Sequence, residues 1–434
     1  MTEYDEKLKR GFCPLPWNHL SANTGASLRV CCNTDHGGHV LNENGDIALL
    51  ENLTSLKAAM NQSTHKTLRA AMMRGERPDF CKRCYREEDS GGHSVRQTYF
   101  NHYPEVLAEA IDKTASDGEI DPKISYVDFS LSNNCNLQCR MCGPTASFPL
   151  QKEFDALGED YEREWAERAR VKWDFEGSLG RIVRDVVPNL TEMLTTGGEP
   201  FISPQHIKIL EMCVDLGRAK EITLRYHSNL TVLPDRLVEL WTHFKQVEIH
   251  CSLEGVDRMN DYVRYPAKWS KIQGNLRKLQ HLKTRLPIFV EVHTCLQAIS
   301  WLRTHELLEW TFAASAEFGG LFPRIPFPIW VDQPYPMTLA CLPPAFRELG
   351  AERILRVLDR NQAAYDGPSS PHFEATSAAS FRGAITRLSE LPYRDEDFHA
   401  FIRRTQAVDR YRKQDITTQI PEFKAYFESE LAPL

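Results

Sequence analysis

From Ile124 onward, short runs of β-branched and aromatic residues alternate with amphipathic stretches of helical period. This alternation is typical of βα units around a parallel sheet. The predicted strands are residues 124–132, 190–198, 221–229, 246–255, 287–296 and 321–330. The predicted helices between them include residues 204–217, 233–244, 269–282 and 304–315. Six such units predict an α/β fold, an incomplete (β/α)6 TIM barrel rather than a closed barrel of eight units.

Segments outside the barrel have other patterns. Residues 1–95 combine five cysteines with the turn-rich patches DHGG and ENGD, which indicates a small N-terminal module, and residues 96–121 are expected to be a linker. The barrel is predicted over residues 122–335, with a polar insertion near 151–181 that adds helices over one rim. A Pro-rich stretch after Trp330 ends the pattern, and residues 336–434 are expected to form a C-terminal helical extension outside the barrel.

Composition and charge exclude several classes of function. The chain has 434 residues, 42% of them hydrophobic, and a formal net charge of −7 with scattered basic residues. Nucleic-acid binding is not expected, because it requires a concentrated basic face. The N-terminus is charged, and no stretch approaches the roughly 18 apolar residues of a membrane span. The sequence therefore predicts a cytoplasmic protein with no membrane partner.

Twelve cysteines without a secretion signal point to metal or redox chemistry rather than to disulfides. The segment SNNCNLQCRMC places Cys135, Cys139 and Cys142 at C-x3-C-x2-C spacing directly after the first predicted strand, at the barrel face where active sites form. Three thiolates suit three corners of a [4Fe-4S] cluster and leave the fourth iron open to a small molecule. Zinc is the competing interpretation, but structural zinc sites use four ligands in paired knuckles, and no fourth Cys or His stands at that spacing.

This spacing, with hydrophobic Met141 before the last cysteine, closely resembles the signature of the radical S-adenosylmethionine (SAM) superfamily. The resemblance implies that SAM chelates the open iron and is cleaved reductively to a 5′-deoxyadenosyl radical, which abstracts hydrogen from a substrate. The segments TTGGEP, HSN and NDYVRYP resemble SAM-binding elements of the superfamily, whereas CSLEG carries Glu254 where many members have Asp. The cofactor-binding residues that the resemblance implies are Met141, Gly197, Gly198, Glu199, Ser228, Asn229 and Arg264.

The early cysteines provide a second ligand set: Cys13, one of the adjacent pair Cys31 and Cys32, Cys81 and Cys84. Spacing alone fits zinc as well as iron. The order C-x2-P-W, a hairpin ending in CC and then C-x2-C resembles the SPASM/twitch module of radical SAM enzymes, although that module normally follows the barrel. The resemblance implies one auxiliary Fe-S cluster, with Cys31 preferred because Leu28 then occupies the inward hairpin position. Its expected roles are electron relay, electron acceptor or structural support.

Lone cysteines are candidates for a hydrogen-atom donor. Cys251 and Cys295 end predicted strands, and Cys341 lies beyond the last strand, whereas Cys213 is expected in a helix core. Free cysteines are commonly small buried hydrophobes. Cys341 resembles in position the hydrogen-donating cysteine of radical SAM peptide epimerases, so Cys341 and then Cys295 are the candidate catalytic residues.

The substrate class follows from the resemblance alone. SPASM/twitch enzymes mostly act on ribosomally made peptides, by Cα epimerisation or crosslinking, which implies a peptide partner and a reductant such as flavodoxin or ferredoxin. Two alternatives stay open. One is the same chemistry on a sugar or nucleoside derivative, and the other is a zinc-stabilised binding protein without redox function.

Overall fold

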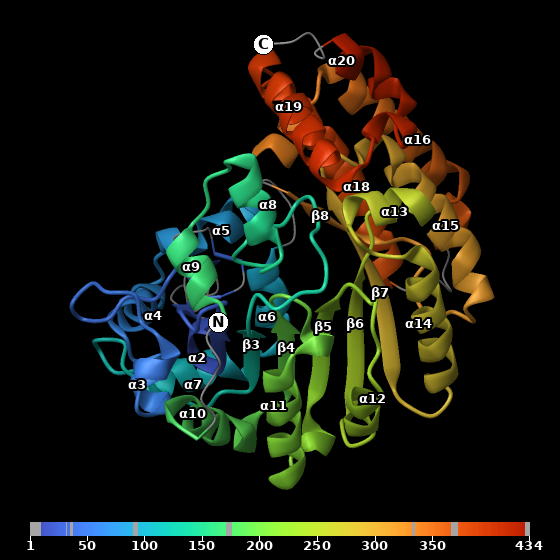
Figure 1. The fold of residues 1–434 in the computed structure, drawn as a ribbon. Helices are drawn as coiled ribbons and strands as arrows, with labels where there is room; N and C mark the ends of the chain where they lie inside the picture. The colour runs from blue at the N-terminus through green and yellow to red at the C-terminus, as the bar shows by residue number, and fades with distance from the viewer. Residues whose placement is uncertain are drawn as a thin grey trace. The chain divides into compact units, whose positions relative to one another are not determined.

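The computed structural model describes residues 10–31, 33–34, 38–89, 94–170, 176–331, 335–365 and 372–429. Eight strands form one sheet in the order β2-β1-β3-β4-β5-β6-β7-β8 (Figure 1). The chain divides into two compact units. The first contains the residues up to Asn134 together with Glu164–Tyr226 and Glu239–Lys245, and the second contains Cys135–Arg163, His227–Val238 and the residues from Gln246 onward.

The six predicted strands are confirmed as β3 to β8. Their bounds are β3 Tyr126–Ser130, β4 Glu192–Thr196, β5 Thr223–Ser228, β6 Gln246–Ser252, β7 Ile288–Leu296 and β8 Phe327–Trp330. Parallel pairing joins β3 to β4, β4 to β5, β6 to β7 and β7 to β8. The fold is therefore α/β and agrees with the expected partial barrel.

Two further strands in the first unit extend this sheet. β1 (His19–Ala22) pairs antiparallel with β2 (Leu28–Arg29) and parallel with β3, with His19 opposite Tyr126. All four residues of β1 are buried. The cysteine-bearing hairpin thus joins the barrel strands through main-chain hydrogen bonds.

Helices of the first unit surround these strands. Around the hairpin and its cysteines lie α2 (Leu15–Asn18), α3 (Leu56–Met60), α4 (Ser63–Met73), α5 (Lys82–Asp89), α6 (Val95–His102) and α7 (Glu105–Lys113). Further along the chain are α9 (Arg163–Arg168), α10 (Ser178–Val186) and α11 (Pro204–Asp215). Ser203 caps α11, since its hydroxyl accepts a hydrogen bond from His206 N. Ile209, Leu210 and Cys213 form the buried face of this helix.

The second unit contains β6, β7 and β8. Its helices are α8 (Leu150–Leu157), α13 (Asp257–Val263), α14 (Trp269–Leu282), α15 (Thr304–Glu317), α16 (Pro344–Arg360), α17 (Gln362–Tyr365), α18 (His372–Leu388), α19 (Asp395–Arg412) and α20 (Lys424–Ser429), while α12 (Asp235–Trp241) is shared between the units. Along β6 buried and half-buried residues alternate, as expected when one strand face packs against helices.

The C-terminal helices form a common core in the second unit. α16, α18 and α19 pack together, shown in orange and red in Figure 1, and bury Phe381, Phe401 and Phe423 almost completely. The C-terminal residues that the structure describes are thus mainly helical. Among the described helices, none combines the length and the apolar composition that crossing a membrane would require.

Candidate functional site

The three-cysteine loop of the second unit is held by main-chain hydrogen bonds. Gln138 N donates to Tyr265 O at 2.6 Å, and Arg140 N donates to Val263 O at 2.9 Å. Leu137, Cys139 and Ala267 form a small buried cluster, against which Cys135, Met141 and Cys142 pack. The structure therefore brings Cys135, Cys139, Cys142 and Met141 together around one buried cluster.

A buried ion pair lies beside these thiols. Arg264 Nη2 donates to Glu254 Oε1 at 2.6 Å, and Arg264 Nη1 lies 3.8 Å from Cys139 Sγ. The second carboxylate oxygen of Glu254 accepts from Cys295 N at 2.9 Å and from Gln297 Nε2 at 3.2 Å. Glu254 thus orients Arg264 towards the cysteines, with the longer Glu side chain in place of the usual Asp.

The electrostatics favour a thiolate at Cys139. A hydrogen bond from the Cys142 thiol lowers the pKa of Cys139 to about 7, burial opposes this shift, and the Arg264 charge adds to it. The pKa of Arg264 is raised: burial lowers it, but the negative charges of Glu254 and Cys139 outweigh that effect. A thiolate donor set beside a permanent cation suits an iron–sulfur cluster, because thiolates are the ligands such clusters use.

The expected SAM contacts in this unit lie close to the loop. Asn229 Nδ2 donates to Asn136 Oδ1 at 3.0 Å, and Asn136 Nδ2 donates to Thr231 Oγ1 at 2.8 Å. Ser228 Oγ accepts from Leu230 N at 3.0 Å, so its side chain also closes a turn after β5. Asn136, which lies between two of the cysteines in sequence, therefore connects the loop to the end of β5.

The guanidinium of Arg264 has one N–H group left to donate a hydrogen bond to a ligand. Its Nε is buried and has no hydrogen-bond acceptor within the described part of the chain. An anionic group such as the carboxylate of SAM would satisfy this donor. The residues of the second unit therefore fit both the cluster and one charged end of SAM.

The GGEP segment lies in the first unit, after β4. Gly197 and Gly198 have φ values of +75° and +58°, and a Cβ on Gly198 would lie 2.2 Å from Asn134 O. Glu199 N donates to Asn134 O at 2.8 Å, and its carboxylate accepts from Phe201 N at 3.2 Å. Gly198 is thus required for the close approach to Asn134, the residue directly before Cys135, whereas a Cβ on Gly197 would lie 2.8 Å from the Cβ of Ser130.

The candidate hydrogen donors have different surroundings. Burial raises the pKa of Cys295, and the adjacent Glu254 raises it further, so this thiol stays protonated. Cys341 is fully buried in the C-terminal helical core, where its Sγ lies 3.4 Å from Pro336 O and burial raises its pKa to about 12. Cys213 and Cys251 are also fully buried. The structure places Cys295, but not Cys341, in contact with Glu254.

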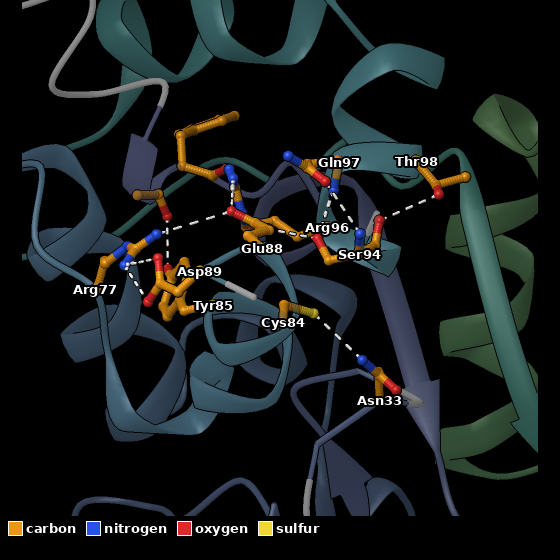
Figure 2. Close-up of polar contacts among 12 residues, drawn as sticks. Asn33, Arg77, Cys84, Tyr85, Glu88, Asp89, Ser94, Arg96, Gln97 and Thr98 are labelled. Atoms are coloured by element: carbon orange, nitrogen blue, oxygen red, sulfur yellow. Dashed lines mark hydrogen bonds and ion pairs between the residues drawn. The ribbon is translucent and has the colours of Figure 1, made fainter. Parts of the chain in front are cut away.

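The early cysteines share one enclosed cavity of the first unit. Cys13, Cys31, Cys81 and Cys84 line it. Asn33 Nδ2 lies 3.3 Å from Cys84 Sγ (Figure 2). Cys32 lies outside the described residues. The structure thus brings together four thiols that the sequence separates by up to 71 positions.

The chemistry of this cavity fits a bound cation. Burial raises the pKa of Cys13, as do the negative charges of Cys81 and Cys31. Burial also raises the pKa of Cys31 to about 11. Thiols grouped in this way lose their protons when a metal centre provides compensating positive charge. The donor set fits an Fe-S cluster, and it fits zinc as well.

Arg96 was not predicted as part of this site. Its guanidinium lines the cavity, donates to Phe12 O at 2.6 Å, and pairs with Glu88 at 2.8 and 2.5 Å (Figure 2). Ser94 caps α6 and donates to Glu88 at 2.5 Å. The S-x-x-Q capping box ahead of an apolar run is visible in the sequence and predicts this helix start, but the contact between Arg96 and the cysteines requires the folded structure.

Comparison with known protein families finds one match. Residues 129–291 match the model of the radical SAM superfamily. This segment starts in β3 and includes the three-cysteine loop. No curated protein sequence is significantly similar to the chain.

Two solved structures illustrate the low structural similarity that the comparison found. Native anSMEcpe with bound AdoMet and Cp18Cys peptide is 12% identical with a TM-score of 0.38, over 56% of this chain and 62% of that chain. Streptococcus suis SuiB bound to precursor peptide SuiA is 15% identical with a TM-score of 0.33, over 62% of this chain and 56% of that chain. The chain thus spans less than two thirds of either structure.

Proposed function

We propose that this protein is a radical SAM enzyme that carries a second, auxiliary Fe-S cluster and acts on a peptide. The observation that carries the proposal is the group of Cys135, Cys139 and Cys142 beside the buried Arg264–Glu254 pair, within a radical SAM domain. When bound there, a [4Fe-4S] cluster supplies the electron that cleaves SAM to methionine and a 5′-deoxyadenosyl radical.

The residues of the chain prepare the site for this chemistry. Arg264 stabilises the Cys139 thiolate by its positive charge, and its free Nε binds the carboxylate of SAM. Glu254 holds Arg264 in this orientation with a hydrogen bond of 2.6 Å. Because all three groups are buried, few water molecules compete with these interactions, and each is stronger than it would be in solvent.

SAM recognition involves further residues that the superfamily resemblance implies. Gly197 and Gly198 provide the backbone and Glu199 the carboxylate for the ammonium of SAM, while Ser228 and Asn229 bind its ribose. These roles come from the resemblance of TTGGEP and HSN to the superfamily elements. The left-handed backbone of Gly197 and Gly198 supports them, because such a turn exposes main-chain groups to a ligand.

Cys295 is proposed as the hydrogen-atom donor. A neutral thiol is the form that donates hydrogen, and burial together with Glu254 keeps this thiol protonated. Cys341 remains the alternative by its position in the chain, although its thiol is enclosed by the C-terminal core. Donation by either thiol would return a hydrogen atom to a substrate radical, which is the outcome of Cα epimerisation.

Two features of the N-terminal residues support the auxiliary cluster and the peptide substrate. Cys13, Cys31, Cys81 and Cys84 line one cavity, as the SPASM/twitch resemblance implies. In that subgroup peptides are the main substrates, so the same resemblance favours a peptide over a small molecule. A flavodoxin or ferredoxin is the proposed source of electrons.

The test is anaerobic reconstitution followed by incubation with SAM and dithionite. We expect about eight irons per chain, as two cubane clusters require, and formation of 5′-deoxyadenosine. The variant with Cys135, Cys139 and Cys142 all changed to Ala should form none, whereas Cys213→Ala should match the wild type because Cys213 lies in the core of α11. Zinc without iron in the purified protein would overturn the proposal.

A further inference from the structure

Three histidines of the second unit lie together on neighbouring strands. His227 is in β5, His250 in β6 and His293 in β7. Each has one ring nitrogen within 4.8 Å of a ring nitrogen of both others. None of the three is accounted for by the three-cysteine loop or by the Arg264–Glu254 pair.

The register between β6 and β7 places His250 and His293 on one side of the sheet. In the parallel pair β6 and β7, His250 is opposite Glu291 and Ser252 is opposite His293. Residues two apart on a strand share a face, so His250 and Ser252 lie on the same face as Glu291 and His293. Cys295 follows His293 by two residues and shares this face, about 7 Å further along β7.

The ring nitrogens converge at a distance that a metal ion would bridge. His250 Nδ1 lies 3.4 Å from His227 Nε2. Two nitrogens bound to one zinc ion at about 2.05 Å each are about 3.3 Å apart at the tetrahedral angle. The rings of His250 and His293 are stacked, with centroids 4.3 Å apart and planes inclined by 11°. The separation of 3.4 Å between His250 Nδ1 and His227 Nε2 therefore matches two ligands of a single ion.

Glu291 occupies the position of an orienting carboxylate. Its Oε2 lies 2.9 Å from His293 Nε2 and 3.9 Å from His250 Nε2. A hydrogen bond from His293 Nε2 leaves the lone pair on Nδ1, which is buried and has no hydrogen-bond partner among the described residues. Metal-bound histidines commonly donate their other N–H to a carboxylate in this way, which fixes the tautomer and the ring orientation.

The protonation state of His227 also suits metal binding. Burial lowers the pKa of His227 to about 3, and the nearby His293 lowers it further. This histidine is therefore neutral at physiological pH, and neutral imidazole is the form that binds metal ions.

We propose that His227, His250 and His293 bind one divalent transition-metal ion of the zinc class, with Glu291 orienting His293. Three histidines leave one coordination position for an exchangeable ligand, either water or an oxygen of the substrate. Imidazole ligands select zinc and similar ions over magnesium or calcium, which prefer oxygen. The site shares no residue with either cysteine set, so its metal content can be tested apart from the radical SAM reaction.

The test uses the reconstituted holoenzyme, equilibrated with zinc chloride and freed of excess ion. Metal analysis is expected to give about one zinc per chain, and the zinc X-ray absorption spectrum should show a nitrogen shell at about 2.0–2.1 Å rather than sulfur at about 2.3 Å. Iron content should be unchanged, since zinc is not expected to replace the clusters. A sulfur shell alone, or no retained zinc, would overturn the proposal.

Matched variants distinguish zinc bound at this site from zinc bound by other histidines. His250→Ala should lose the retained zinc, and His250→Phe should do the same while it preserves the stacked ring and hence the packing against His293. Glu291→Gln should weaken zinc binding by about 10–100-fold, as second-sphere changes do. His243→Ala is the control, because His243 is exposed at the end of α12. Equal zinc retention in His250→Phe and wild type would contradict the proposal even if the alanine variant fails to fold.

Discussion

Arg264 contacts two acidic partners at once, with Nη2 2.6 Å from Glu254 Oε1 and Nη1 3.8 Å from Cys139 Sγ. The side chain of Glu254 is fully buried and that of Arg264 is 11% exposed. Removal of one partner would therefore leave a buried charge without compensation. This relationship gives the first prediction.

Glu254→Gln should destabilise the protein by about 3–5 kcal/mol, because it leaves Arg264 buried and unpaired. It should also reduce 5′-deoxyadenosine formation, since Arg264 is no longer held towards Cys139. Chemical denaturation and product analysis measure the two effects. Glu352→Gln is the control: it breaks an exposed pair with Arg356 and should change stability by less than about 1 kcal/mol. Equal effects of the two substitutions would contradict the structural role of Glu254.

Gly198→Ala should impair SAM binding because it displaces the backbone around residue 198. A Cβ at Gly198 would lie 2.2 Å from Asn134 O, and the residue already has a φ of +58°. The chain directly before Cys135 must then shift. We expect weaker SAM binding and less 5′-deoxyadenosine, measured by equilibrium dialysis and chromatography.

Gly217→Ala is the matched control for this substitution. Gly217 has a similar φ of +69°, but a Cβ there would meet nothing within 4 Å. This variant should show only the conformational cost of about 1–2 kcal/mol, with SAM binding unchanged. If Gly198→Ala also binds SAM normally, the close approach to Asn134 has no role in the site.

Substitution of the early cysteines should remove one cluster and preserve the other. Cys81→Ala combined with Cys84→Ala is expected to lower the iron content by about four per chain, as the loss of one cubane implies. SAM cleavage with dithionite should persist, since the three-cysteine loop is intact. Iron and sulfide analysis measures the change, and Cys32→Ala should retain full iron. An unchanged iron content in the double variant would contradict the auxiliary cluster.

Cys295→Ala should block the transfer of a hydrogen atom back to the substrate radical, while SAM is still cleaved. The thiol beside Glu254 is removed, whereas the cysteine loop and the Glu254–Arg264 bond remain. In a peptide co-expressed in heavy water, deuterium incorporation should be lost in Cys295→Ala and retained in Cys341→Ala. The opposite result would assign the donor role to Cys341.

His206 should make the stability of the protein depend on pH in mild acid. Burial lowers the pKa of His206 to about 3 in the folded protein, against an ordinary value of 6.5. Below pH 6.5 the unfolded chain binds a proton at this position that the folded protein does not, so stability falls as pH decreases. Between pH 7.5 and 5.5 the loss from this one group is about 1.4 kcal/mol.

The variant His206→Gln should lack this contribution. Its free energy of unfolding, measured by urea denaturation at both pH values, should fall by about 1.4 kcal/mol less than that of the wild type. The other buried histidines are common to both proteins and cancel in the comparison. Identical pH dependence would mean that His206 is protonated in the folded protein, despite Tyr226 OH at 2.9 Å from its Nε2.

Much of the barrel was predictable because each strand is indicated by a short local pattern of β-branched and aromatic residues. All six predicted strands are present, and α14 spans residues 269–282 as predicted. The largest difference is β8, which covers residues 327–330 rather than 321–330. Pro323 and Pro326 explain the late start, because proline has no N–H to donate within a sheet.

Contacts between distant segments could not be predicted in the same way. The parallel pairing of β1 with β3 joins residues more than one hundred positions apart and leaves no periodic signal. The histidine cluster is similar: HSN, EIHCS and EVHTC each carry one histidine, but only the strand registers bring them together. The cysteine motifs, by contrast, are read directly from their spacing.

The pairing of β1 with β3 also has a consequence for synthesis on the ribosome. Ser21 and its partner Asp128 are 107 positions apart in the chain. At about 5–20 residues per second, β3 is made roughly 5–20 seconds after β1. During that interval the hairpin of β1 and β2 has an open edge, at which a nascent chain is prone to aggregate. Growth at lower temperature or with added chaperones should therefore raise the yield of the full-length protein more than its equilibrium stability alone would suggest.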